Sequence, residues 1–341
     1  MSEKTPKSDG GVTQESIFGT DEEVERRRTP PAERARRAFD FYIATPFRVA
    51  WTDWRTRIGG IGVLLYLLMG TVGVWLVPPP QINEGPYYLD PFVDWSMPLG
   101  TDNLGRGIFK TLVHSTPAMM KMALAGIVFT VGVAVLVGMI AGYKGGVVDT
   151  LLMTITDVFI TLPGLPLIIV LAAIFSPDDP FIVGTIIAID QWPRLARMLR
   201  SQVLALREED FVEAARSIGL STPTIVGQEL VPKVAPFVLI SAAGAAVGVI
   251  FQSVALYFIG VLPFSSLNWG VMMQLAYTQG NAVAAPGRAG HWLLFPLLAI
   301  SGVSFSLILF SQGLDRVFNP RLLARHSQTV PEDEQEEAGG L

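Results

Sequence analysis

The stretch DFVEAARSIGLSTPTIVGQELVP, residues 210 to 232, is a polar segment between two long apolar runs. Its first part has the periodicity of an amphipathic helix, because its apolar residues recur on one side of a 3.6-residue turn. The apolar stripe of this helix consists of Phe211, Val212, Ala215 and Ile218. Away from the stripe lie the charged residues Glu208, Glu209, Glu213 and Arg216. A segment that only joined two apolar runs would not need such defined local structure.

One glycine and two prolines set the ends of the segment. Gly219 stands where a helix commonly ends in a left-handed residue, a conformation that glycine adopts without steric cost. We expect Thr222 to cap a second short helix with Pro223 at its first position, and Pro232 to end that helix. The sequence therefore predicts two short helices joined by a rigid turn at Gly219.

The composition is that of a membrane protein. Of the 341 residues, 50% are hydrophobic and only 16% are charged, and the mean hydropathy is +0.44. The apolar residues form blocks, as expected for a chain that crosses the membrane several times. The absence of cysteine excludes disulfides, thiolate zinc sites and a cysteine nucleophile. No apolar region lies near Met1, so we expect no cleaved signal peptide.

Six apolar blocks are long enough to cross a bilayer as helices, which takes about 20 residues each. The expected spans are residues 58 to 77, 118 to 142, 149 to 175, 181 to 199, 234 to 260 and 292 to 314. The third contains LPGLP, where Pro163 and Pro166 remove backbone donors, so it should kink or unwind in part. The segments GMIAG (138 to 142) and GAAVG (244 to 248) each place two glycines on one helix face, a pattern typical of close helix packing. The sequence thus predicts an all-α fold with six transmembrane helices.

The distribution of lysine and arginine orients these spans. With the amino terminus inside, the inner segments carry 21 of the 25 basic residues. The positive-inside rule therefore predicts that both termini are cytoplasmic. Only 6 of the 25 basic residues are lysine, and glycine and alanine are abundant, which indicates a prokaryotic source. The expected location is thus the inner or plasma membrane of a prokaryotic cell. The same orientation places residues 210 to 232 in a cytoplasmic loop.

Four regions follow from this topology. Residues 1 to 57 are expected to form a cytoplasmic tail, disordered at first and ending in an interfacial elbow helix. Residues 58 to 117 hold the first span and an external segment, which could touch a substrate-delivering protein or only cap the helices. Residues 118 to 318 form a five-helix core with the helix pair at about 205 to 231. Residues 319 to 341 are an acidic cytoplasmic tail.

The polar loop resembles a known signature. Glu213, Ala214, Ala215, Gly219 and Pro232 follow the E-A-A-x-x-x-G pattern of ATP-binding-cassette importer permeases. In that family the loop is a coupling helix that docks in a cleft of the cytoplasmic ATPase subunit. The resemblance implies that Glu213, Ala214, Ala215, Arg216 and Gly219 receive the ATPase. It also implies the type I importer permease fold.

Other segments are similar to one branch of that family, the dipeptide, oligopeptide and nickel permeases. They are PLGTDNLGRGIF from residue 98, AGYKGGVVDTLLMTITDVFITLPGLPL from 141, QWPRLARMLRSQVLALREEDFVEAAR from 191 and GLDRVFNPR from 313. The resemblance covers about residues 47 to 325. The chain departs from the branch at three positions: Gly107 replaces a usual Asp, Glu229 stands where His is frequent, and Asp190 falls where a small neutral residue is usual.

The resemblance implies a set of partners and a substrate class. The partners are a second homologous permease, two ATP-binding-cassette ATPases, an extracytoplasmic binding protein and membrane lipid, with no nucleic acid. The implied substrates are dipeptides or oligopeptides, and nickel, another small solute or export stay open. The chain contains no Gly-Lys dipeptide and hence no Walker A loop, and it has no catalytic or metal-binding motif. We therefore expect a non-catalytic subunit without its own cofactor, whose partners bind ATP and Mg.

A second class of function is also compatible with the composition. An ion-coupled secondary transporter would use buried Asp157 and Asp190 as carriers of protons or sodium ions. That alternative gives no reason for the helix pair at Gly219. In a permease, the candidate pathway residues are Asp190, Asp157 and Pro163. Asp190 has two readings: it pairs with Arg194 one turn on, or it meets the charged amino terminus of a passing peptide.

Overall fold

The computed structural model describes residues 51, 53–263 and 267–318, so most of the predicted N-terminal elbow and the acidic tail lie outside it. Among the described residues, the regular elements are all helices, apart from one isolated bridge between Thr101 and Gly107, which confirms the all-α class. The elements are α4 (Trp54–Leu68), the π turn η3 (Met69–Gly73), α5 (Val74–Leu76), α6 (Ile108–Lys144), α7 (Gly146–Thr161), α8 (Gly164–Phe175), α9 (Pro180–Ile187), the 3-10 turn η4 (Ala188–Asp190), α10 (Trp192–Leu206), α11 (Asp210–Ser217), α12 (Thr222–Thr224), the π turn η5 (Ile225–Leu230), α13 (Val231–Phe258), α14 (Trp269–Thr278) and α15 (Pro286–Phe318).

Among the described residues, four helices are long and apolar enough to cross a membrane. They are Trp54–Leu76, Ile108–Lys144, Thr222–Phe258 and Pro286–Leu314. A fifth span is possible if α7 and α8, which meet at an angle of 88°, count as one broken span. The predicted span 181 to 199 is divided between the short apolar helix Pro180–Asp190 and the more polar α10. Six spans therefore stay a prediction.

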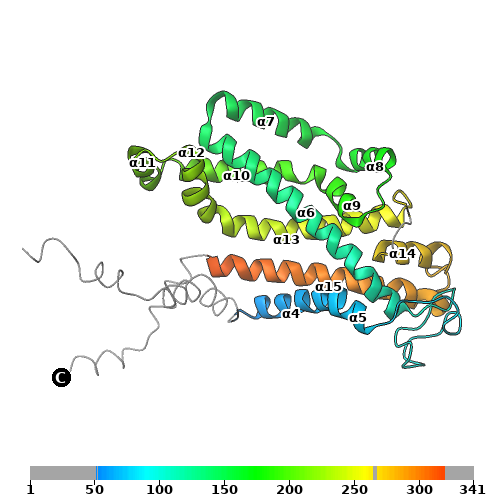
Figure 1. Cartoon of the computed structure of the whole chain (residues 1–341). Coiled ribbons are helices and arrows are strands. Elements are labelled where there is room, and N and C mark those ends of the chain that lie inside the picture. The colour runs from blue at the N-terminus through cyan, green and yellow to red at the C-terminus, as the bar shows by residue number, and fades with distance from the viewer. Residues whose placement is uncertain (1–50, 52, 264–266, 319–341) are drawn as a thin grey trace, which may run out of the picture. The chain divides into compact units, whose positions relative to one another are not determined.

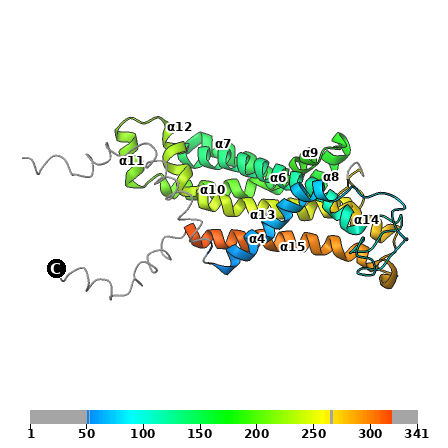
Figure 2. The same ribbon diagram turned by 60° about the horizontal axis from the view of Figure 1, so that its bottom comes forward.

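The helices pack in two groups that share α6 and α13. The helices α4 and α15 run side by side in opposite directions, and α6 packs against α9, α10 and α13 (Figures 1 and 2). The helix α11 lies at the end where α4 begins and α15 ends, and the segment 77–107 lies at the opposite end. This arrangement matches the predicted separation of the polar loop from the external segment.

Glycines allow close contact between α6 and α10. A Cβ atom at Gly138 would lie 2.5 Å from the carbonyl oxygen of Ala196, and one at Gly142 would lie 2.8 Å from Cβ of Val203. The prediction of close packing is thus confirmed for GMIAG. It is wrong for Gly244 within this chain, where a Cβ atom would meet nothing within 4 Å.

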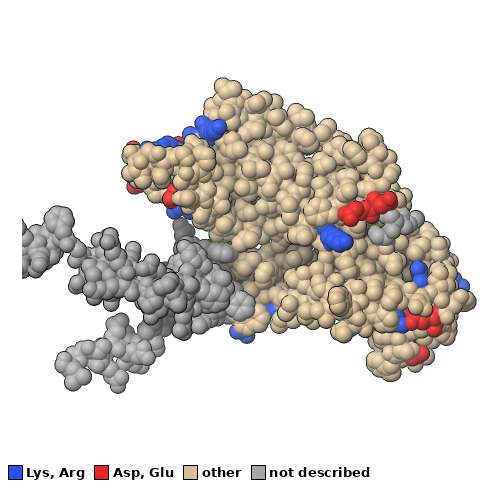
Figure 3. Space-filling model, in the orientation of Figure 1, with Lys and Arg blue, Asp and Glu red and all other residues tan. Residues whose placement is uncertain are grey.

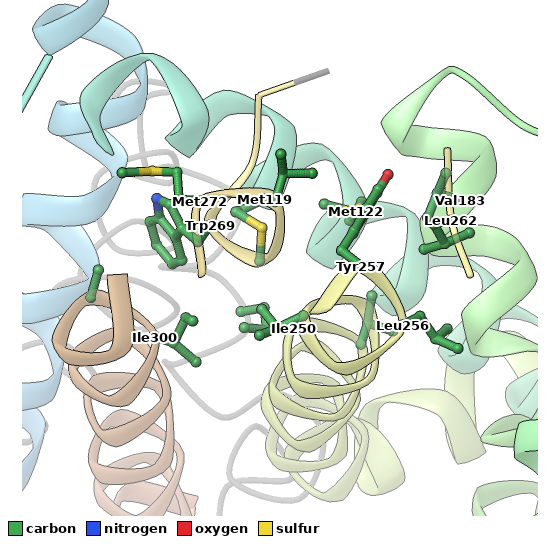
Figure 4. Packing of buried hydrophobic residues seen from close by; sticks show 14 of the residues in the cluster. Met119, Met122, Val183, Ile250, Leu256, Tyr257, Leu262, Trp269, Met272 and Ile300 are labelled. Atoms are coloured by element: carbon green, nitrogen blue, oxygen red, sulfur yellow. The ribbon is translucent and has the colours of Figure 1, made fainter. Parts of the chain in front are cut away.

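The buried side chains form two clusters. The larger one joins α6, α9, α13, α14 and α15 around Met119, Met122, Tyr257 and Trp269 (Figure 4). The smaller one lies where α6, α10, α11 and η5 meet. Many large apolar side chains stay exposed outside both clusters, such as Leu136 at 63%. Charged side chains gather toward the ends of the helices and leave the middle of the visible face almost free of charge (Figure 3), as expected for a surface in contact with lipid.

Candidate functional site

The short helix α11 and the turn after it form the polar loop singled out by the sequence. The helix runs from Asp210 to Ser217, and Gly219 follows with φ +81°. The Leu220 N–H donates to the Ala215 carbonyl at 3.1 Å, and the Gly219 N–H donates to the Arg216 carbonyl at 3.0 Å. These bonds satisfy carbonyls that the helix end would otherwise leave unpaired. The predicted left-handed turn at Gly219 is confirmed.

One side of α11 is anchored in the smaller buried cluster. Val212 and Ala215 are buried there together with side chains of α10, η5 and α13. Phe211 is partly buried, and Nζ of Lys233 lies 4.0 Å from its ring centre. Ile218 does not belong to this face, because it is 76% exposed. The predicted stripe is wrong at Ile218, since α11 ends at Ser217 and the chain turns before Ile218 could reach the cluster.

The other side of α11 faces away from the protein. Glu213, Ala214 and Arg216 are exposed, and no ion pair involves Glu213 within the described part of the chain. Arg216 is held by Tyr143 at the end of α6. Its guanidinium carbon lies 5.2 Å from the ring centre, and its Nε donates to the phenol oxygen at 3.4 Å. The polar loop therefore presents the carboxylate of Glu213 to solvent and keeps Arg216 on the protein.

The chain after Gly219 differs from the expected separate helix. Ser221, not Thr222, is the N-cap of α12, with extended backbone angles and its hydroxyl 2.8 Å from that of Thr224. Pro232 does not end the helix, because α12, η5 and α13 form one continuous helical stretch, Thr222–Phe258. Proline is tolerated in the first turn of α13, and the wider π turn before it accommodates the missing N–H and the bulk of the ring. The polar loop is thus joined to a membrane helix without a break.

The candidate pathway residues Pro163 and Asp190 come together where two helices are interrupted. Pro163 is the N-cap of α8 at the 88° bend. The bend brings the next residue, Gly164, over Asp190, so that a Cβ atom there would lie 2.2 Å from Oδ2 of Asp190. From α13, the side-chain amide of Gln252 donates to the same oxygen at 3.4 Å. Oδ1 of Asp190 is buried and has no hydrogen-bond partner.

The predicted ion pair between Asp190 and Arg194 is not formed. Both residues are described, and none of the ion pairs of the described residues joins them. The reason is the chain path: Asp190 belongs to the 3-10 turn η4, whereas Arg194 belongs to α10. The two residues are therefore not stacked on one regular helix face.

Asp157 lies in a different environment from Asp190. Its side chain is 58% exposed in this chain and pairs with Arg197 of α10. The expectation that Asp157 is buried is therefore wrong. Nearby on the same two helices, Arg200 makes a two-bond ion pair with Asp149.

The external segment is held together by residues of the GTDNLGR motif. Asp102 is buried, accepts from the N–H groups of Leu104 and Arg106, and pairs with the Arg106 side chain at 2.6 Å. His291 of α15 donates to the carbonyl of Thr101 at 3.1 Å. These inward contacts favour a structural role for the motif. Gly107, the position at which the family usually has Asp, is the N-cap of α6 and supplies no side-chain acceptor.

Two residues of these sites carried no prediction. Tyr143 lies in the AGYKGG segment that resembles the permease branch, but that resemblance gives it no role, and only the structure shows that it holds Arg216. Gln252 is a polar residue in the middle of an apolar run, and that pattern alone could have identified it. A separate cavity of about 490 Å³ between α4, α6, α13 and α15 is lined mainly by apolar residues such as Met120 and Trp269, and it contains none of the predicted pathway residues.

Comparison with known proteins finds a matching family model and several relatives of similar length. The model of the family described as "Binding-protein-dependent transport system inner membrane component" matches residues 134–324, more than half of the chain. The dipeptide transport system permease protein DppC of Bacillus subtilis is 29% identical over 79% of this chain and 82% of DppC. The glutathione transport system permease protein GsiD of Pectobacterium atrosepticum is 29% identical over 83% of this chain and 94% of GsiD. The nickel transport system permease protein NikC of Escherichia coli K12 is 28% identical over 80% of this chain and 97% of NikC.

Proposed function

The chain belongs to the family of binding-protein-dependent transport system inner membrane components, and we propose that it is a permease subunit of an importer for dipeptides or oligopeptides. Membership makes it a multi-pass, non-catalytic subunit of an ATP-binding-cassette importer of the inner membrane. It also implies ATPase and binding-protein partners in general. The proposal adds a second homologous permease, two ATPase subunits that bind ATP and Mg, and cytoplasmic termini.

The observation that carries the proposal is the polar loop. The helix α11 is anchored on one side by Val212 and Ala215, exposes Glu213 and Ala214 on the other, and ends in a rigid turn at Gly219. After the turn at Gly219 the chain continues as the helical stretch Thr222–Phe258, which is long and apolar enough to cross a membrane. A displacement of α11 by an ATPase subunit would therefore be passed on to α13. Substrate would cross between the two permeases as their interface alternates between outward and inward access.

Peptides are the preferred substrate because of the relatives. DppC is named for dipeptides, GsiD for glutathione, and another similar chain, from Brucella suis, is named a putative peptide permease. NikC is named for nickel, so nickel is the alternative substrate for the same architecture. The secondary-transporter alternative loses support, since Asp157, one of its two proposed ion carriers, is exposed and paired with Arg197.

Substrate-stimulated ATP hydrolysis tests the substrate class. The chain would be purified with co-expressed neighbouring subunits and reconstituted with the binding protein. Short peptides, glutathione and nickel would then be compared as stimulants of ATP hydrolysis. Stimulation by peptides supports the proposal, whereas stimulation by nickel alone would replace the substrate and keep the architecture.

A thiol cross-link tests the docking role of α11. The chain contains no cysteine, so a single introduced cysteine is the chain's only thiol. Ala214→Cys, on the exposed side of α11, should cross-link to an ATPase subunit through a short thiol-to-amine reagent. The matched control is Val283→Cys, 64% exposed in the loop between α14 and α15, which lies at the opposite end of the helices from α11 (Figure 1). This cysteine should not cross-link to an ATPase subunit. Equal cross-linking of both, or of neither, would argue against docking on α11.

A further inference from the structure

Three polar side chains form a short network at the interruption between α9 and α10. Gln191 donates through Nε2 to Oε1 of Gln252 at 3.2 Å, and Gln252 donates through Nε2 to Oδ2 of Asp190 at 3.4 Å. The network lies against backbone, because Gly164 faces Asp190 and a Cβ atom at Gly248 would lie 3.0 Å from Oε1 of Gln191. Around it are apolar residues of the larger cluster, such as Ile187 and Val249.

The direction of these hydrogen bonds is fixed by the carboxylate. An ionised aspartate only accepts, so Gln252 must turn its NH2 group toward Asp190 and its oxygen toward Gln191. Gln191 must then donate to that oxygen, which leaves its own oxygen pointing elsewhere. Oδ1 of Asp190 has no partner, and no bond to Oε1 of Gln191 is found among the described residues. The acceptors left without a donor are Oδ1 of Asp190 and Oε1 of Gln191, and each amide NH2 group keeps one further N–H.

The charge of Asp190 is stabilised without being neutralised. The first turn of α8 lies against Oδ2, and Asp190 precedes Gln191, the N-cap residue of α10. Helix N-termini carry partial positive charge, which favours a carboxylate nearby. Neither helix end bonds to Oδ1, and Arg194 is not paired with Asp190. An unpaired charge in an otherwise apolar span is costly, and such residues commonly face a substrate or ion pathway.

We propose that Asp190, Gln191 and Gln252 form a binding site for a protonated amine of the transported substrate. An ammonium group has three N–H donors and no acceptor, so it matches a site with surplus acceptors and one negative charge. In a short peptide this group is the amino terminus. Oδ1 is buried in this conformation, so the amine reaches it during the opening that alternating access requires. The inference rests on the proposed import of peptides.

Covalent capture tests the site directly. The complete transporter in nanodiscs, turning over ATP, would be treated with dicyclohexylcarbodiimide and alanylalaninamide, which has a free amine and no carboxylate. The reagent activates a carboxylate, the amine attacks the carbonyl carbon, and an amide forms as the urea leaves. Peptide mapping should find the amide at Asp190, and it should be absent with the N-acetylated compound. Amide formation at exposed Asp94 with none at Asp190 would overturn the proposal.

Uptake by two matched variants separates this site from the function on which it rests. Asp190→Asn removes the charge with almost no change in shape and should lower the uptake of free-amine peptides at least tenfold. Asp94→Asn makes the same change at an exposed position of the external segment and should stay within about twofold of the wild type. Wild-type activity in Asp190→Asn, or an equal loss in both variants, overturns the amine site. Failure of the proposed function would look different, because the wild type itself would import no peptide.

Discussion

The guanidinium carbon of Arg216 lies 5.2 Å from the ring centre of Tyr143, so the exposed side of α11 is tied to the last turn of α6. The opposite side of α11 is tied to α10 and α13 through Val212 and Ala215. The polar loop is therefore clamped between membrane helices rather than suspended on a flexible linker. Such a clamp transmits a displacement only while both attachments hold.

Removing the contact between Arg216 and Tyr143 should loosen α11. An exposed cation–π contact contributes about 0.5 to 1 kcal/mol, so Arg216→Ala and Tyr143→Ala should each speed amide hydrogen exchange at residues 210–220 severalfold. The double variant should be no faster than either single one, because both remove the same contact. Tyr143→Phe keeps the ring and is the control. It should speed hydrogen exchange at residues 210–220 much less than Tyr143→Ala does. Additive effects of the two alanine variants would show that the contact does not hold α11.

A side chain at Gly219 should distort the turn after α11. Its φ of +81° is strained for residues with a Cβ atom, although a Cβ atom there would meet nothing within 4 Å. Gly219→Ala should therefore cost about 1 kcal/mol through the backbone alone, and Gly219→Val more. We expect both variants to insert in the membrane and to lose substrate-stimulated ATP hydrolysis, Gly219→Val the most.

Gly227 offers a matched comparison for this change. It also has open space around a Cβ atom, but it lies within the π turn η5 and has no positive φ. Gly227→Ala should be neutral or slightly stabilising, because alanine favours helical backbone. If Gly219→Ala and Gly227→Ala behaved alike in stability and in coupling, the backbone conformation at Gly219 would not be important.

The contact between α6 and α10 should not tolerate a methyl group at Gly138. A Cβ atom there would approach the Ala196 carbonyl oxygen to 2.5 Å, and backbone can relieve such a clash only by moving a helix. Gly138→Ala should lower the free energy of unfolding by about 1 to 3 kcal/mol. Gly132→Ala, in the same helix with nothing within 4 Å, is the control and should be neutral or stabilising. Thermal unfolding of the detergent-purified chain compares the two, and equal melting temperatures would contradict the packing described above.

An acceptor at the start of α6 should stabilise the external end. Gly107 has extended backbone angles that any residue can adopt, and a Cβ atom would have only ordinary contacts, with Lys110 at 3.7 Å. Gly107→Asp should raise the free energy of unfolding by about 0.5 to 1 kcal/mol, by accepting free N–H groups and complementing the helix dipole. Gly107→Ala adds a side chain without an acceptor, so it should not raise the free energy of unfolding. A gain from alanine equal to that from aspartate would mean that capping is not the cause.

Local backbone chemistry is what the sequence predicts best. The left-handed turn at Gly219 and the break at Pro163 follow from steric rules that involve only neighbouring residues. Close packing at Gly138 was also predictable, because small residues on one face allow helices to approach. The continuation of the helix through Pro232 could not be predicted, because the π turn that accommodates the proline depends on how η5 packs.

Partners distant in the chain were beyond sequence reasoning. The prediction for Asp190 considered Arg194, four residues away, whereas the bend at α8 and the packing of α13 place Gly164 and Gln252 beside it instead. The prediction that Asp157 is buried was wrong for a related reason. An apolar run identifies a span but does not say which of its faces is covered, and Asp157 lies on an open face.

Uptake into proteoliposomes tests the central claim most directly. The liposomes would contain this chain, its partner permease and the ATPase subunits, with ATP inside and peptide-loaded binding protein outside. The account predicts peptide accumulation that requires both ATP and the binding protein, and no accumulation driven by a proton or sodium gradient alone. Gradient-driven uptake by this chain without ATP or ATPase subunits would contradict it.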